Sequence, residues 1–185
     1  MDNAKKPGSA QIAFKWTLIY VVTSIVITFA FQFLNVNQAS SVKYLGYIPF
    51  IAFLLLAQKE YRDQLGGFIS FGDGFVAGLL YSVFSGIILA VFIYIYFAII
   101  SPQVWQQMLE FQRQAMQDKN YSADQIDQGM NFMQKFGVIF AAVGVLIMTP
   151  IIGAIIALIG AAIFKKEKSI LDIEKDASNH SDPVS

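Results

Sequence analysis

The chain has 185 residues, of which 56% are hydrophobic and only 14% are charged. Soluble domains carry about a quarter charged residues, so this composition favours a protein embedded in lipid. The 13 basic and 13 acidic residues balance, which argues against nucleic acid as a partner. There is no cysteine, and the single histidine, His180, lies in a polar C-terminal stretch. Disulfides, thiolate metal sites and histidine bases are therefore excluded from the apolar body.

Four apolar segments predict an all-α, polytopic membrane protein with four transmembrane helices. The expected spans cover residues 16–34, 42–59, 71–100 and 136–164. At 1.5 Å per residue the first is about 28 Å long, close to the hydrocarbon thickness of a bilayer. We divide the chain into a cytoplasmic N-terminal segment (1–15), a membrane domain (16–166) and a disordered cytoplasmic tail (167–185).

The second segment leaves two interpretations open. Its apolar core, residues 44–57, is short enough to be a re-entrant piece rather than a full span. Lys43 and Lys59 bound it, and because long basic side chains reach the interface, they favour a full span. Pro49 lies inside the segment, and we expect it to kink the helix or to end one half of it.

Small residues recur at every fourth position of the third segment, and the fourth offers a similar series. They are Gly74, Gly78, Ser82 and Gly86 in the third, with Gly153 and Ala157 in the fourth. Lipid supplies little hydrophobic drive between helices, so close backbone approach through small residues is a main source of association. We expect a helix-packing face, either between spans three and four of one chain or between two copies.

A charged connector, residues 58–70, precedes the third span. Gly66 and Gly67 permit a tight reversal of the chain. Ser70 and Asp73 have the spacing of a capping box, and Asp73 is favourably placed in the positive first turn of the helix. The sequence therefore predicts a turn and a defined helix start at 66–73.

Ionisable groups suited to chemistry are scarce. Arg62 and Asp63, with Asp73, are a candidate lipid head-group or ion contact. The alternative, which we favour, is a turn in which Asp73 caps the helix while Arg62 and Asp63 stay solvated. No carboxylate, lysine, arginine or histidine lies deep in a predicted span, which argues against a proton-coupled transporter and an intramembrane hydrolase. We expect no catalytic, metal or cofactor-binding residues, and no enzymatic activity.

The region between spans three and four predicts two amphipathic helices separated by a turn at Asn120-Tyr121. We expect residues 102–135 to pair as an external helical hairpin that prolongs both spans. Its apolar stripe can also serve as a contact for another membrane or periplasmic protein, or lie on the outer membrane face.

Basic residues indicate the orientation. With four spans, nine lie on one side, namely Lys5, Lys6, Lys15, Lys59, Arg62, Lys165, Lys166, Lys168 and Lys175. The other side has Lys43, Arg113, Lys119 and Lys135. The positive-inside rule then places both termini in the cytoplasm and the 102–135 hairpin outside.

One block carries a resemblance to a known family. Arg62, followed by the run 66–75 (GGFISFGDGF), resembles the Bacteroidetes membrane proteins that carry domain of unknown function 4199. The start of span one, 14–17 (FKWT), also resembles that family, with Thr17 where a glycine is expected. The resemblance covers roughly residues 13–166. It implies a four-span inner-membrane protein and supplies no activity.

Two functions are compatible with these features. The preferred one is a non-enzymatic membrane scaffold or partner-binding subunit, in which a homo-oligomer is allowed. The alternative is a small permease or channel formed by oligomerisation. A solvent path lined by Thr28, Gln32, Tyr81 and Ser85 would favour transport.

Overall fold

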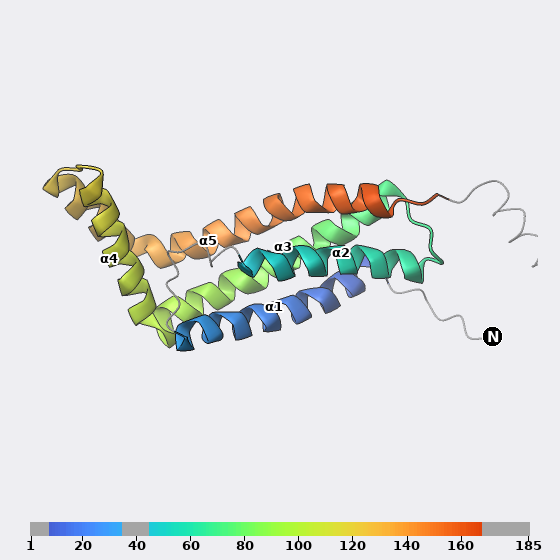
Figure 1. Ribbon diagram of the computed structural model, residues 1–185, viewed down its shortest axis with the longest axis horizontal. Helices are drawn as coiled ribbons and strands as arrows, with labels where there is room; N and C mark the ends of the chain where they lie inside the picture. The colour runs from blue at the N-terminus through green and yellow to red at the C-terminus, as the bar shows by residue number, and fades with distance from the viewer. Residues whose placement is uncertain (1–7, 35–44, 168–185) are drawn as a thin grey trace, which may run out of the picture. The chain divides into compact units, whose positions relative to one another are not determined.

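The computed structural model describes residues 8–34 and 45–167 (Figure 1). The helices are, in chain order, α1 (Ser9–Phe33), α2 (Tyr47–Gln64), α3 (Phe71–Ile95), a π-helical turn (Tyr96–Ile100), α4 (Pro102–Asp118) and α5 (Ala123–Phe164). The extended backbone in these two ranges is limited to an isolated antiparallel bridge between Ile69 and Lys166. The all-α prediction is confirmed.

Three helical segments are long and apolar enough to cross a membrane: Ser9–Phe33, Phe71–Ile100 and Ala123–Phe164. They contain the predicted first, third and fourth spans, apart from Leu34. Three such helices fit a multi-pass membrane protein. The second predicted span corresponds to α2, which is not among them because its last turns are charged.

Helix α2 corrects two sequence predictions. The connector was expected to begin at Gln58, but α2 continues to Gln64, because glutamine, lysine, glutamate and arginine are good helix formers. The kink predicted at Pro49 is also wrong. The helix begins at Tyr47, so Pro49 lies in its first turn, where a missing N–H leaves no helical carbonyl unpaired.

The other helix boundaries also differ from the expected ones. α1 begins at Ser9, before the predicted start of the first span at residue 16, so Lys15 is helical. By contrast, α5 is a single helix that runs from the second helix of the predicted hairpin into the fourth span, as expected, and it continues through Pro150. The predictions for residues 1–7, the polar loop at 35–44 and the tail at 168–185 lie outside the described residues.

The end of α3 turns the chain sharply. The Ser101 N–H donates to the Tyr96 carbonyl, five residues back, at 2.8 Å, which closes the π-helical turn. Ser101 then leaves the helical region (φ −137°), and Pro102 opens α4 at its first position. α4 consequently runs across the direction of the second half of α3 (Figure 1). The expectation that it prolongs the third span is wrong.

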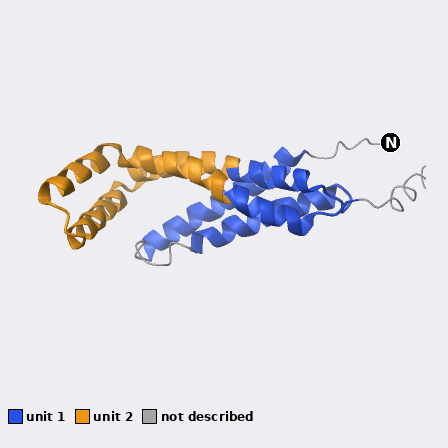
Figure 2. Cartoon of the chain, turned by 90° about the horizontal axis from the view of Figure 1, so that it is seen from above, with its two compact units in different colours: residues 1–82, 153–185 blue, residues 83–152 orange. Residues whose placement is uncertain are grey.

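The chain forms two compact units (Figure 2). Unit 1 combines residues 1–82 with 153–185, and unit 2 is residues 83–152. The core of unit 1 contains Tyr20, Phe50 and Tyr81, whose ring centroids lie 5.3–6.0 Å apart. In unit 2, a buried cluster joins α4 to the first turns of α5; its members are Trp105, Leu109, Ile126 and Met130.

Candidate functional site

In unit 1, the small residues of α3 meet those of α5. A Cβ placed on Gly74 would lie 3.4 Å from Ala161, and one placed on Gly78 would lie 2.7 Å from the Ala157 Cβ. A Cβ on Gly153 would collide with Ser82, which is itself fully buried. These contacts join two helices of the same chain.

The fourth glycine of the predicted packing face, Gly86, lies in unit 2. A Cβ there would lie 3.2 Å from the Pro150 ring and 3.4 Å from the Leu146 carbonyl oxygen. Pro150 has no N–H to give to that carbonyl, which is four residues before it. Gly86 therefore lets α3 approach the place where α5 has lost a helical hydrogen bond.

The polar centre of unit 1 is Gln58 of α2, a residue that the sequence placed in the connector. Its side chain is fully buried. Its Nε2 donates to the carbonyl oxygens of Gly74 on α3, at 2.9 Å, and of Ala157 on α5, at 2.8 Å. One amide thus ties α2 to both helices of the small-residue seam.

The space for this amide is made by glycines. A Cβ on Gly78 would lie 2.8 Å from Gln58 Nε2, and one on Gly160 would collide with Gln58 Oε1. No group within residues 8–34 and 45–167 donates a hydrogen bond to that oxygen. Small residues at four-residue spacing were visible in the sequence, but they did not reveal that a third helix inserts a polar side chain between them.

Other polar groups in unit 1 also hold helices together. Thr17 on α1 is fully buried and donates to the Tyr81 carbonyl oxygen at 3.2 Å. The Tyr81 hydroxyl donates to the Phe50 carbonyl oxygen, also at 3.2 Å. Tyr81 therefore belongs to the aromatic core that joins α1, α2 and α3.

The other residues of the predicted transport path are Thr28, Ser85 and Gln32. Thr28 donates to the Ser24 carbonyl oxygen of its own helix at 2.8 Å. Ser85 is fully buried in unit 2, and Gln32 is half-buried near the end of α1.

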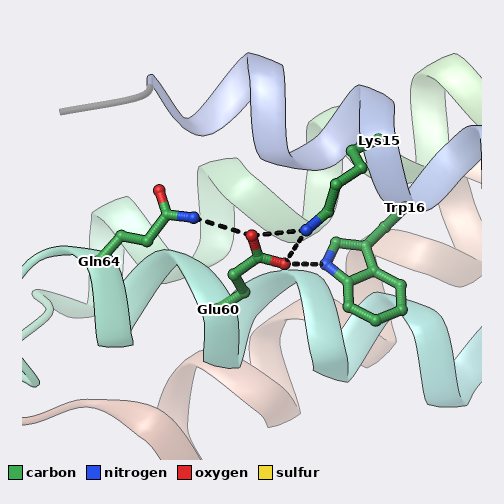
Figure 3. Close-up of polar contacts among 4 residues, drawn as sticks. All are labelled: Lys15, Trp16, Glu60 and Gln64. Carbon is green, nitrogen blue, oxygen red and sulfur yellow. Dashed lines mark hydrogen bonds and ion pairs between the residues drawn. The ribbon is translucent and has the colours of Figure 1, made fainter. Parts of the chain in front are cut away.

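A charged cluster fastens the start of α1 to the end of α2 (Figure 3). Glu60 accepts hydrogen bonds from the Lys15 ammonium, at 2.6 Å to Oε1, and from the Trp16 indole, at 2.7 Å to Oε2. Gln64 donates to the same carboxylate at 2.8 Å. Burial raises the pKa of Glu60, but these hydrogen bonds outweigh it and hold the pKa below its ordinary value.

The connector between α2 and α3 is a short, well-defined turn. Gly66 and Gly67 have φ angles of +83° and +85°, in the left-handed region that favours glycine. Ser70 Oγ accepts from the Asp73 N–H at 3.1 Å and donates to the Asp73 carboxylate at 2.7 Å. Between them, Ile69 exchanges both backbone hydrogen bonds with Lys166 at the end of α5, at 2.9 and 3.0 Å.

The residues of the candidate head-group contact are divided between two sets of contacts. Arg62 forms an ion pair with its neighbour Asp63 at 2.8 Å, and its guanidinium lies 5.5 Å from the ring centroid of Phe164. Asp73 engages Ser70 instead. Within the described ranges, no cluster of three or more histidine, cysteine, aspartate or glutamate residues is suited to a metal ion.

A family model matches most of the chain. The model described as a protein of unknown function, DUF4199, matches residues 15–166. The chain belongs to this family. No curated protein and no solved structure matches it. In this DUF4199 protein, the matched region includes Lys15, the whole α2–α3 turn and Lys166. Hydrogen bonds of these residues join the helix ends at one end of unit 1.

Proposed function

We propose that this DUF4199 protein crosses a bacterial inner membrane four times, with both termini in the cytoplasm. α2 is the proposed crossing that cannot be recognised from its composition alone. Trp16 stacks with Phe53 and Tyr20 packs on Phe50, so α2 runs antiparallel to α1 along its length. Two polar side chains of α2 have partners on other helices: the Gln58 Nε2 donates to two backbone carbonyls, and Glu60 pairs with Lys15. Such pairing lowers the cost of placing Gln58 at membrane depth, and Glu60 lies just beyond the proposed span of 42–59.

We further propose that the protein is a non-enzymatic membrane scaffold or partner-binding subunit. The observation that supports this most is the use of its buried polar side chains. Gln58, Thr17 and Tyr81 all donate hydrogen bonds to backbone carbonyls of other helices, and these bonds hold the helices together. An enzyme would need convergent ionisable groups around a pocket.

The partner contact is proposed for residues 102–135, the paired α4 and the first turns of α5. A photo-crosslinking residue at Gln117, an exposed position near the end of α4, tests this in native membranes. A discrete protein adduct is expected. Adducts with lipid alone, or none, would contradict a partner at this position.

The competing function is a small permease or channel. It requires a wet path past Tyr81, whose side chain is fully buried against Phe50 and Tyr20. Solute-flux assays on purified protein in vesicles separate the two functions. We expect no flux above that of empty vesicles, and flux abolished by Tyr81→Phe would favour transport.

A further inference from the structure

Helix α4 and the first turns of α5 form an antiparallel pair with a defined seam. A Cβ on Gly137 would collide with Trp105, and Met116 at the other end of α4 lies against Gly129. Trp105, Leu109, Ile126 and Met130 fill the seam between them. All of these residues belong to unit 2.

One flank of this seam is polar. Arg113 on α4 and Asp127 on α5 lie there and approach each other to 3.7 Å. At 100° per residue, Gln106 falls on the same flank of α4, and Asn131 on the same flank of α5. Both are exposed.

The opposite flank is apolar and exposed. On α4 it carries Met108 and Phe111, the latter 55% exposed. On α5 it carries Phe132, Phe136 and Phe140, whose four-residue spacing forms one stripe. The centroid of the Phe132 ring lies 5.4 Å from those of both other rings. Because the helices are antiparallel, the two stripes face the same side of the pair.

We propose that this apolar face, Met108, Phe111, Phe132, Phe136 and Phe140, rests on the lipid surface at the boundary between head groups and acyl chains. The inference rests on the proposed placement of α5 across the membrane, and not on the partner-binding role.

Two observations select lipid as the occupant. The stripe on α5 continues without a break into the apolar stretch of the same helix, where Val143 and Ile147 are also exposed. The face is thus continuous with the surface that α5 presents to acyl chains. In addition, α4 runs across the direction of the second half of α3 instead of continuing along it (Figure 1). A helix that lies on a membrane has this orientation relative to a helix that crosses it.

The charges of the pair are compatible with a zwitterionic surface. Residues 102–135 carry three basic and four acidic side chains, so no attraction to anionic lipid is required. The energy of binding comes from apolar area, with phenylalanine and methionine entering the boundary by about 5–10 Å. Arg113 and Asp127 then face water, which leaves the polar flank free for a protein partner.

The natural absence of cysteine makes single-cysteine spin labelling direct. Labels are placed on the full chain in phosphatidylcholine vesicles at Phe111→Cys and Phe132→Cys, with matched controls at Gln106→Cys and Asn131→Cys. Relaxation enhancement by oxygen, which concentrates in lipid, is compared with that by a water-soluble nickel chelate. The oxygen-to-nickel ratio should be severalfold higher on the apolar flank than at the controls.

Equal ratios on the two flanks would place the apolar face in water and overturn the proposal. An immobilised label shielded from both reagents would mean that a protein or a second copy covers the face, and would overturn it as well. A label at Val143→Cys tests the premise separately. If Val143 itself is accessible to nickel, the proposed crossing by α5 fails, whatever the result at Phe111.

Discussion

At the scale of single residues, Gln58 shows how one buried amide organises unit 1. A glutamine that supplies two hydrogen bonds to backbone carbonyls fixes both the depth and the rotation of α2 against α3 and α5. The Nε2 group makes both of these bonds, whereas Oε1 has no partner among residues 8–34 and 45–167. Substitutions that keep the shape but remove the donor therefore test it most sharply.

Gln58→Glu keeps the size of the side chain and replaces the donor by a carboxylate facing two carbonyl oxygens. An uncompensated buried charge costs about 3–5 kcal/mol, so a large loss of stability is expected in detergent unfolding experiments. The same change at the exposed Gln107 is the control and should alter stability by less than about 0.5 kcal/mol. Equal effects at the two positions would show that Gln58 is not the tie between the helices.

Glu60 makes the stability of unit 1 depend on pH. Since folding lowers its pKa, the carboxylate stabilises the fold fully above its unfolded-state pKa, and this contribution is lost as the pH falls through the lower, folded-state pKa. The stability gap between the natural chain and Glu60→Gln should therefore shrink below pH 4.5, the ordinary value. Denaturation measured across this range checks the trend.

Lys15→Met supplies the control for that experiment. It removes the strongest hydrogen-bond donor to Glu60, so the pH-dependent part of the gap should be reduced in this background. A gap between natural and Glu60→Gln chains that stays constant down to acidic pH would contradict the assigned role of the carboxylate.

At the scale of elements, the helical glycines differ in whether a side chain would fit in their place. At Gly78, a Cβ would meet both Ala157 and Gln58, and overpacking of this kind costs about 1–3 kcal/mol. Gly144, also within a helix, has nothing within 4 Å of a Cβ. There the better helix propensity of alanine should add up to about 1 kcal/mol.

Gly78→Ala and Gly144→Ala are therefore expected to change stability in opposite directions. Thermal unfolding of both purified variants in the same detergent is the measurement. Two changes of the same sign would show that the contacts at Gly78 do not limit the approach of α3 and α5.

The sequence allowed these elements to be predicted where their signal is local. The apolar runs gave the long helices, and the residues at 66–73 gave the turn, because left-handed glycines and a serine cap act within a few positions. The role of Gln58 could not be predicted, since it depends on carbonyls 16 and 99 residues away. The direction of α4 was also missed, because a π-helical turn leaves no clear mark in the sequence.

At the scale of the whole molecule, we propose that α2 crosses the membrane and brings the number of crossings to four. Two contacts within unit 1 support this proposal: Lys15 binds Glu60, and Ile69 binds Lys166. These contacts gather the start of α1, the end of α2, the start of α3 and the end of α5 at one end of that unit. The basic residues there agree with a cytoplasmic location.

The most direct test is the labelling of single cysteines by a membrane-impermeant maleimide in intact cells. Leu34→Cys and Gln117→Cys should react from outside, whereas Gln64→Cys and Glu167→Cys should react only after the membrane is permeabilised. If Gln64→Cys and Leu34→Cys instead react from the same side, α2 does not cross the membrane, and the four-span account is contradicted.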